Sequence, residues 1–222
     1  MELLVVIAIM VILAFVALPA LSSLVGSGNA NRNVSQLSDV LELAREYAVA
    51  NNTYVWVAFY PATGTNGVTS LSVAVFASND GTDPANSTSA PWGNASCSYG
   101  TVPSSEISLI NKVITLQQIL LQNAGTYAVS SLPTTPTVTS AANSVASNSG
   151  GFFAMTLPSG TSTVNFTQGI EYLPTGQARN GSSPTNVIDL DVDPQAGNVP
   201  QPQNAAVVRI NGLTGEPVVY RN

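Results

Sequence analysis

The chain has 222 residues, and its six basic and twelve acidic residues, only 8% of the whole, give a formal charge of −6. This length suits one globular domain with an appendage, and the charge argues against broad attraction to nucleic acid or anionic lipid. The absence of histidine and the single cysteine, Cys97, exclude Ser-His-Asp and Cys-His nucleophiles, imidazole metal sites and an intrachain disulfide. We therefore expect no enzyme and no cofactor.

The first predicted element is an apolar helix. Residues 3–18 read LLVVIAIMVILAFVAL, without one polar side chain, so the helix is apolar on every side. The run covers about 24 Å, and it reaches the ~30 Å of a bilayer core only if residues 19–25 extend it. No Lys or Arg occurs before Arg32, which argues against a secretory signal peptide. We predict a helix buried in a membrane or a filament core, with a kink at Pro19.

Glu2 stands directly before this apolar run. In one interpretation the segment is an ordinary single-pass anchor, and the Glu2 carboxylate lies at the membrane interface without a role. In the other the carboxylate is buried and requires a partner, because an intramembrane charge is costly unless it is neutralised. An ammonium group of a neighbouring chain would supply both charge and hydrogen-bond donors. The second interpretation predicts that Glu2 directs subunit assembly.

An amphipathic helical segment is predicted over 29–52. Its apolar residues recur at helical spacing on one face, namely Val34, Leu37, Leu41, Ala44 and Ala48. This face should pack on a globular head. Asn51 and Asn52 are the predicted end of the helix, since asparagine tolerates the left-handed conformation found there.

The rest of the chain, 53–222, shows period-two patterns that predict strands. The predicted strands lie at 53–60, 71–76, 152–157, 164–173, 187–192, 205–211 and 217–220. Residues 112–122 suit a strand or a helix, and loop insertions are expected near 78–105 and 130–151. A helix followed by strands predicts an α+β fold. In it a long N-terminal helix, with 1–28 as the membrane or filament-core half and 29–52 as the amphipathic half, packs on a β-rich antiparallel head.

Several of these segments resemble a known family. The run that begins ELLVVIAI at Glu2 looks like the N-terminal methylation helix of type IV pilins and type II secretion pseudopilins. LELAREYAVANN at 41–52, YLPTG at 172–176 and VVRINGLTG at 207–215 are similar to the GspH/FimT group of minor pseudopilins. The resemblance leaves residues 78–151 unmatched.

The resemblance implies a pilin-like structural subunit of a type II secretion or type IV pilus-like fibre. It implies pilin or pseudopilin subunits as partners through the N-terminal helix, and a single-pass location in the inner membrane with the head outside the cytoplasm. Glu2 occupies the position of the family's glutamate, which pairs with the terminal amine of a neighbour. The basic leader and cleavage glycine are absent before Glu2, where Met1 stands, so prepilin peptidase is expected to act only on a longer precursor.

A second functional hypothesis is a membrane-anchored surface binding module, either an adhesin or a DNA-uptake pilin. Its loops near 78–105 and 130–151 would recognise the ligand. FimT-like relatives used in DNA uptake are thought to use basic C-terminal residues, and this chain has Arg179, Arg209 and Arg221 in that part. Acidic residues outnumber these arginines after residue 170, so we expect no nucleic-acid partner.

Asp189, Asp191 and Asp193 alternate with aliphatic residues, so a strand would project all three carboxylates from one face. An EF-hand is excluded, because Pro194 and Pro200 occupy the positions of its glycine and its final glutamate. An irregular calcium site stays open, and the solvated face of an exposed strand is the favoured interpretation.

Overall fold

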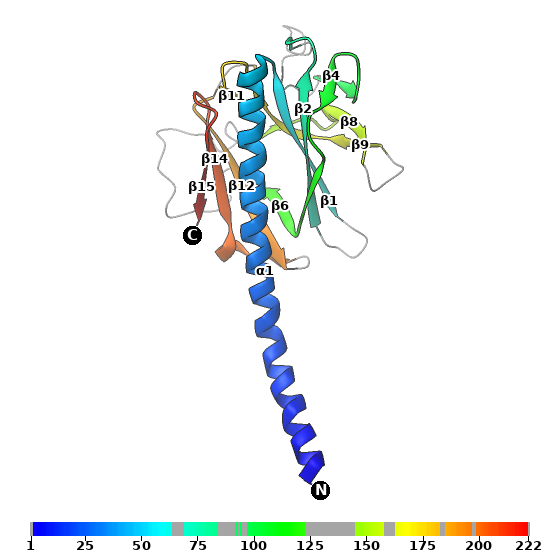
Figure 1. Ribbon diagram of the computed structural model, residues 1–222, viewed down its shortest axis with the longest axis vertical. Coiled ribbons are helices and arrows are strands. Elements are labelled where there is room, and N and C mark those ends of the chain that lie inside the picture. The colour runs from blue at the N-terminus through cyan, green and yellow to red at the C-terminus, as the bar shows by residue number, and fades with distance from the viewer. Residues whose placement is uncertain are drawn as a thin grey trace.

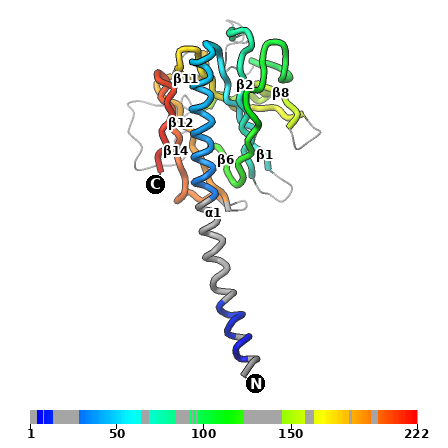
Figure 2. The backbone as a smooth tube through the Cα atoms, viewed as in Figure 1, coloured from blue at the N-terminus to red at the C-terminus, as the bar shows by residue number. Residues whose placement is uncertain are grey.

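The structure is a computed structural model, and it describes residues 2–63, 69–83, 92, 94, 97–122, 145–157, 163–182, 185–196 and 199–221. Helix α1 is assigned over Glu2–Asn51. The side chains of α1 are described only within a 9-residue N-terminal piece, 5–13, and a 23-residue piece, 29–51. We call the first the N-terminal piece and the second the docked piece. Figure 2 colours the described parts of the chain along its length.

The strands pair into three sheets, and β3 with β8 is the parallel pair among the described strands. The largest sheet has the order β11-β10-β1-β2-β4, with β7 beside β10 and β5 beside β2. The second has the order β13-β12-β14-β15 with β6 beside β12, and the third is β3-β8-β9. The strand bounds are β1 Val55–Thr63, β2 Thr69–Ser78, β3 Gly100–Thr101, β4 Ile107–Leu109, β5 Ile114–Gln117, β6 Ile119–Gln122, β7 Ala146–Ser147, β8 Phe153–Thr156, β9 Thr163–Phe166, β10 Gln168–Tyr172, β11 Ala178–Arg179, β12 Val187–Ala196, β13 Val199–Pro200, β14 Ala206–Asn211 and β15 Pro217–Arg221, with a 3₁₀ turn η1 at Pro202–Asn204.

The docked piece of α1 lies against both large sheets, as Figure 1 shows. The predicted apolar face is confirmed, since Val34, Leu37, Leu41, Ala44 and Ala48 are all buried. They share one core with inward-facing residues of β1, β2, β10, β12 and β14. The helix ends at Asn51, and Asn52 has a φ of 50°, which confirms the predicted stop.

Strand β1 is buried on both faces. Val55, Val57 and Phe59 belong to the core under α1, whereas Trp56 and Ala58 belong to a second, aromatic core on the opposite face. The third sheet supplies Phe153 and Phe166 to that second core. A strand that is buried on both sides reads as a nearly continuous apolar run, which explains the sequence VWVAF.

The segment 112–122, which suited either helix or strand, forms β5 and β6. Strand β5 pairs with β2 of the first sheet, and β6 pairs with β12 of the second. Gln118 lies between them with a φ of 57°. Its backbone N–H donates to the Thr69 carbonyl at 2.8 Å, and its carbonyl accepts from the Gln195 N–H at 2.9 Å. Gln118 is therefore the corner at which one extended segment passes between the sheets.

The turn between β14 and β15 holds the docked piece in place. Arg45 Nε donates to the Thr214 carbonyl at 2.7 Å. Gly215 has a φ of +70°, and a Cβ there would lie 2.0 Å from the Gly176 carbonyl oxygen. Only glycine fits this backbone position, which accounts for the glycines in YLPTG and NGLTG.

The predicted fold class is wrong. The described part of the chain is mostly β, with 46% strand against 22% helix, and its helical residues form a 9-residue piece and a 23-residue piece rather than one long N-terminal helix. The physical reason is that most of the core of the head comes from strands. Helix α1 buries one apolar face against the head, whereas residues of the three sheets supply the rest of the two hydrophobic cores. Within the described part of the chain, no helical stretch combines the length and the apolar character needed to cross a membrane.

Candidate functional site

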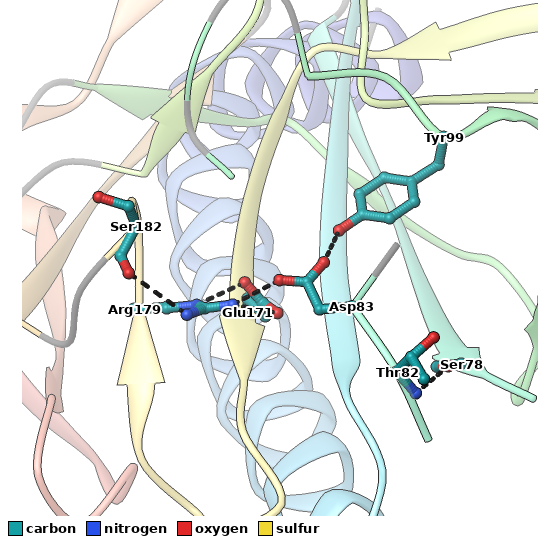
Figure 3. A network of polar contacts seen from close by, with 7 residues as sticks. All are labelled: Ser78, Thr82, Asp83, Tyr99, Glu171, Arg179 and Ser182. Atoms are coloured by element: carbon teal, nitrogen blue, oxygen red, sulfur yellow. Dashed lines mark hydrogen bonds and ion pairs between the residues drawn. The ribbon is translucent and has the colours of Figure 1, made fainter. Parts of the chain in front are cut away.

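A buried network of charged side chains joins the first sheet to the segment that follows β2 (Figure 3). Arg179 lies at its centre. Its Nε and Nη2 donate to the two carboxylate oxygens of Glu171 at 2.7 and 2.9 Å, and Nη2 also donates to Asp83 Oδ2 at 2.6 Å. Tyr99 donates its hydroxyl proton to Asp83 Oδ1 at 2.7 Å. The Ser182 carbonyl accepts from Nη1 at 3.4 Å.

The sheet register brings these groups together. Glu171 of β10 lies between Trp56 of β1 and Arg179 of β11 in the strand pairing, so the glutamate and the arginine are on one sheet face beside the aromatic core. Asp83 and Tyr99 approach from the segment between β2 and β3. The Arg179 guanidinium also lies 5.9 Å from the centre of the Tyr54 ring, within the range of a cation–π contact.

Burial dominates the electrostatics of this network. The Glu171 side chain is fully buried, and this burial raises its pKa to about 8, against the lowering effect of the Arg179 hydrogen bond. Burial, followed by the charges of Glu171 and Asp83, also raises the pKa of Tyr99. One guanidinium faces two carboxylates, so a proton on Glu171 would leave the group neutral overall.

Stability should therefore fall as pH rises through the titration of Glu171. Its pKa is about 8 in the folded chain against an ordinary 4.5, so between these values the folded chain binds more protons than the unfolded chain, and the stabilisation present below pH 4.5 is lost toward pH 8. Glu171→Gln should remove this pH dependence. The difference in the free energy of unfolding between wild type and the variant should therefore change by a few kcal/mol between pH 5 and pH 8.

Urea unfolding at several pH values measures this effect. Glu106→Gln, at an exposed acid, is the matched control and should follow the wild-type curve. Parallel curves for wild type and Glu171→Gln would show that Glu171 does not titrate differently in the folded chain.

The network is suited to structure rather than to catalysis. Arg179, Glu171 and Asp83 satisfy one another, and Tyr99 has a raised pKa that keeps its phenol protonated. The Tyr99 hydroxyl donates to the Asp83 carboxylate, but its raised pKa disfavours the ionised form that would act as a nucleophile. The network fastens the segment after β2 to the β10–β11 edge.

The three aspartates of β12 lie on one sheet face as predicted, but that face is not solvated. Asp189 is 6% exposed, Asp191 1% and Asp193 0%. Arg209 of β14 pairs with Asp189 through Nε at 2.7 Å and Nη2 at 2.8 Å. The hydrogen bond that Arg209 donates to Asp189 is the main cause of the raised pKa of Arg209. The solvated-strand interpretation is therefore wrong.

Asp193 differs from its neighbours, because neither of its carboxylate oxygens has a hydrogen-bond partner and both are buried. Two residues further along the same strand, Gln195 accepts a 2.8 Å hydrogen bond from Thr69. Among the described residues, no group of three or more Asp, Glu and Cys side chains is arranged to hold a metal ion.

A polar pocket of about 400 Å³ lies where α1 ends. Its lining consists mainly of amides and hydroxyls, from Tyr47, Asn51, Asn52, Thr53, Ser78, Asn79, Asp80 and Ser108, together with Ala77 and Gly81. Hydrogen bonds from the side chain and backbone of Thr82 and from Ser78 lower the pKa of Asp80. The pocket therefore offers one carboxylate among neutral hydrogen-bonding groups.

The structure describes only some of the other residues that the sequence singled out. The side chains of Glu2 and Pro19 lie outside the described residues, as do residues 130–144 of the second insertion. The first insertion, expected to be exposed, contributes the buried Trp92 and Cys97 to the aromatic core. Arg179 and Arg209 are buried in ion pairs, and Arg221 donates to Asn31.

Sequence reasoning missed Glu171 and Asp83 as a unit with Arg179. One signal was present: Glu171 is a lone charge in the apolar strand QGIEYL, and a charge within a buried strand requires a partner. Asp83, however, lies 96 residues from Arg179, and no local pattern links them. Comparison with protein-family models, curated proteins and solved structures finds no match for this chain.

Proposed function

We propose that the chain is a structural subunit of a type II secretion or type IV pilus-like fibre, of the minor pseudopilin kind, and that it assembles through its N-terminal helix. The observation that carries this proposal is the apolar surface of the N-terminal piece of α1. Eight large apolar side chains there are 50–65% exposed: Val5, Val6, Ile7, Ile9, Met10, Val11, Ile12 and Leu13. In Figure 1 this end of α1 lies away from the sheets.

A contiguous apolar surface of this size marks a surface that another partner covers. Full burial of each such side chain contributes about 1.5–3 kcal/mol, so covering the piece yields a large driving force. Because the apolar residues lie on all sides of the helix, several neighbouring helices suit it better than one groove. The docked piece is packed on the head by its buried face, so assembly through the N-terminal piece leaves the head outside the helical core.

Membrane residence belongs to the same proposal. Before assembly, the sixteen apolar residues of 3–18 would hold the subunit in the inner membrane with its head outside the cytoplasm. Prepilin peptidase is a partner if a longer precursor exists.

The test is substitution of Glu2. Glu2→Leu and Glu2→Ala should reduce incorporation into the fibre at least about tenfold, because they remove the proposed partner of a neighbour's terminal amine, and breaking a buried ion pair costs about 3–5 kcal/mol. The head should keep its thermal unfolding transition. Glu46→Leu, at an exposed position of the docked piece, is the control. Incorporation of both Glu2 variants at the wild-type level would count against the proposal.

The polar pocket favours the second candidate, a surface binding module. It lies at the end of the docked piece, so the N-terminal piece of α1 takes no part in it. Amide and hydroxyl groups suit a neutral, hydroxyl-rich ligand such as a glycan, which the fibre subunit could bind in addition to assembling.

A further inference from the structure

We propose that the polar pocket at the end of α1 binds an amino sugar, whose ammonium group is held by Asp80. This inference rests on the second candidate function, the surface binding module, and adds a positive charge to its hydroxyl-rich ligand. The pocket has a volume of about 400 Å³, within the range of ~300–1,000 Å³ that small-molecule sites occupy. In Figure 1 this end of α1 lies at the pole of the molecule opposite to the N-terminus, so a fibre built on the N-terminal piece does not need to cover it.

The side-chain amides of the pocket lining use their donor groups within the protein. Asn51 Nδ2 donates to the Tyr47 carbonyl at 3.0 Å, and Asn79 Nδ2 donates to the Ser105 carbonyl at 3.1 Å. The oxygen of each amide is an acceptor with two lone pairs, and none of the described residues donates to it. Asn51 and Asn79 therefore offer a ligand their acceptors.

The hydroxyl and backbone donors of the lining are largely used in the same way. The Thr53 hydroxyl donates to the Ser78 carbonyl at 2.8 Å. The backbone N–H groups of Asn52 and Thr53 donate to carbonyls of α1 at 3.4 and 3.1 Å, and that of Asn79 donates to the Glu106 carbonyl at 2.8 Å. The remaining hydroxyl groups can donate or accept. The pocket thus presents more acceptors than donors, and a donor-rich ligand suits it.

Asp80 supplies a negative charge to the same pocket. Its Oδ1 accepts from the Ser78 hydroxyl at 2.8 Å, from the Thr82 N–H at 3.0 Å and from the Thr82 hydroxyl at 2.7 Å. None of the described side chains donates to Oδ2. Because these hydrogen bonds, first of all the one from the Thr82 hydroxyl, lower the pKa of Asp80, its carboxylate is ionised at mildly acidic pH.

The end of the helix adds to this charge. The C-terminus of a helix carries about half a negative charge on its carbonyl groups, and the last turn of α1 has no basic residue. The described lining of the pocket also includes no lysine or arginine. A cation is therefore the missing complement of the pocket.

An amino sugar provides both properties. An ammonium group has a positive charge, three donors and no acceptor, which matches Asp80 Oδ2 and the helix end. The hydroxyl groups of the same sugar supply donors for the amide oxygens of Asn51 and Asn79. A lysine side chain also carries an ammonium group, but its four-carbon stem has no donors for these oxygens. The lining therefore favours an amino sugar over a basic peptide.

The test is binding of the glucosamine disaccharide to the full chain in detergent, by isothermal titration calorimetry at pH 6 to keep the amines protonated. The N-acetylated disaccharide is the matched probe, because it keeps the ring hydroxyl groups but has no charge. The glucosamine disaccharide should bind at least tenfold more tightly, since charge-assisted hydrogen bonds are the stronger ones. Equal binding of both would overturn the requirement for an ammonium group and leave glycan binding intact. Binding of neither would overturn the inference and count against the glycan-binding candidate.

Variants and a peptide probe locate the recognition. Asp80→Asn keeps an acceptor oxygen for Ser78 and Thr82 but removes the charge, so it should weaken binding of the glucosamine disaccharide at least tenfold. Asp39→Asn, at an exposed acid of α1, removes the same charge elsewhere and should leave binding unchanged. An equal loss in both variants would show general attraction to an acidic chain and overturn the site.

Dilysine carries ammonium groups without sugar hydroxyl groups, and it should bind at least tenfold more weakly than the glucosamine disaccharide. Equal binding of dilysine would overturn the assignment of a sugar. The comparison of the two disaccharides on the wild-type chain decides the requirement for an ammonium group even if Asp80→Asn fails to fold.

Discussion

Arg179→Met should lower the free energy of unfolding by about 3–5 kcal/mol at pH 7, which is the range expected when a buried ion pair loses one partner. Arg179 is the described cation that binds both Glu171 and Asp83. Without it, the buried Asp83 carboxylate loses its cation next to Tyr99. The loss should be larger at pH 9, because Glu171, with a pKa of about 8, is largely protonated at pH 7 and largely ionised at pH 9.

Chemical denaturation with a fluorescence readout measures this loss. Arg32→Met removes an arginine from an exposed position of α1, and it should change stability by no more than about 0.5 kcal/mol. Combining Arg179→Met with Glu171→Gln should restore part of the stability at pH 9, where Glu171 is ionised and the glutamine carries no charge. A loss below about 1 kcal/mol for Arg179→Met, or no restoration in the double variant, would show that the network does not fasten this edge of the sheet.

The sequence predicted helical and strand segments well where apolar residues recur at a clear helical or two-residue spacing. The face Val34, Leu37, Leu41, Ala44 and Ala48 follows the helical repeat over four turns, and these residues are buried. The strands β8, β12, β14 and β15 lie where alternation predicted them. In each case the local repeat places the element along the chain and sorts its side chains onto faces.

Local periodicity could not determine what covers a face. Asp189, Asp191 and Asp193 were correctly placed on one side of a strand, yet their burial depends on packing by other parts of the chain. The corner at Gln118 depends on two backbone hydrogen bonds to different sheets, and the pairing of Asp83 with Arg179 spans 96 residues. These features arise from tertiary contacts, which leave no repeat in the sequence.

The fold class was wrong for a related reason. The helical signal over 2–52 is strong because its residues are contiguous, whereas the strands are short and dispersed between turns. Prediction from the sequence gives one long helical segment more weight than many short strands. The described chain nevertheless contains about twice as much strand as helix.

Leu13→Lys should abolish assembly of the full chain. The Leu13 side chain is 64% exposed on the N-terminal piece of α1, so its replacement cannot disturb the core of the head. In an assembly built on this piece, the lysine would be enclosed by apolar side chains of neighbouring helices, and burying an unpaired charge costs several kcal/mol. Since 1.4 kcal/mol is a tenfold change in an association constant, assembly should weaken by at least a hundredfold.

The head offers a closely matched control. Leu213, in the turn between β14 and β15, is 63% exposed, so Leu213→Lys makes the same substitution at nearly the same exposure. The two variants have the same composition and charge. They differ only in whether the lysine lies on the N-terminal piece or on the head.

The most direct measurement is sedimentation of the full chain after detergent removal, with electron microscopy of the pellet. Wild type and Leu213→Lys should form fibres of uniform width, while Leu13→Lys should stay in the supernatant with an unchanged unfolding transition of the head. Fibres of Leu13→Lys at the wild-type level, or their loss in Leu213→Lys instead, would contradict assembly through the N-terminal helix.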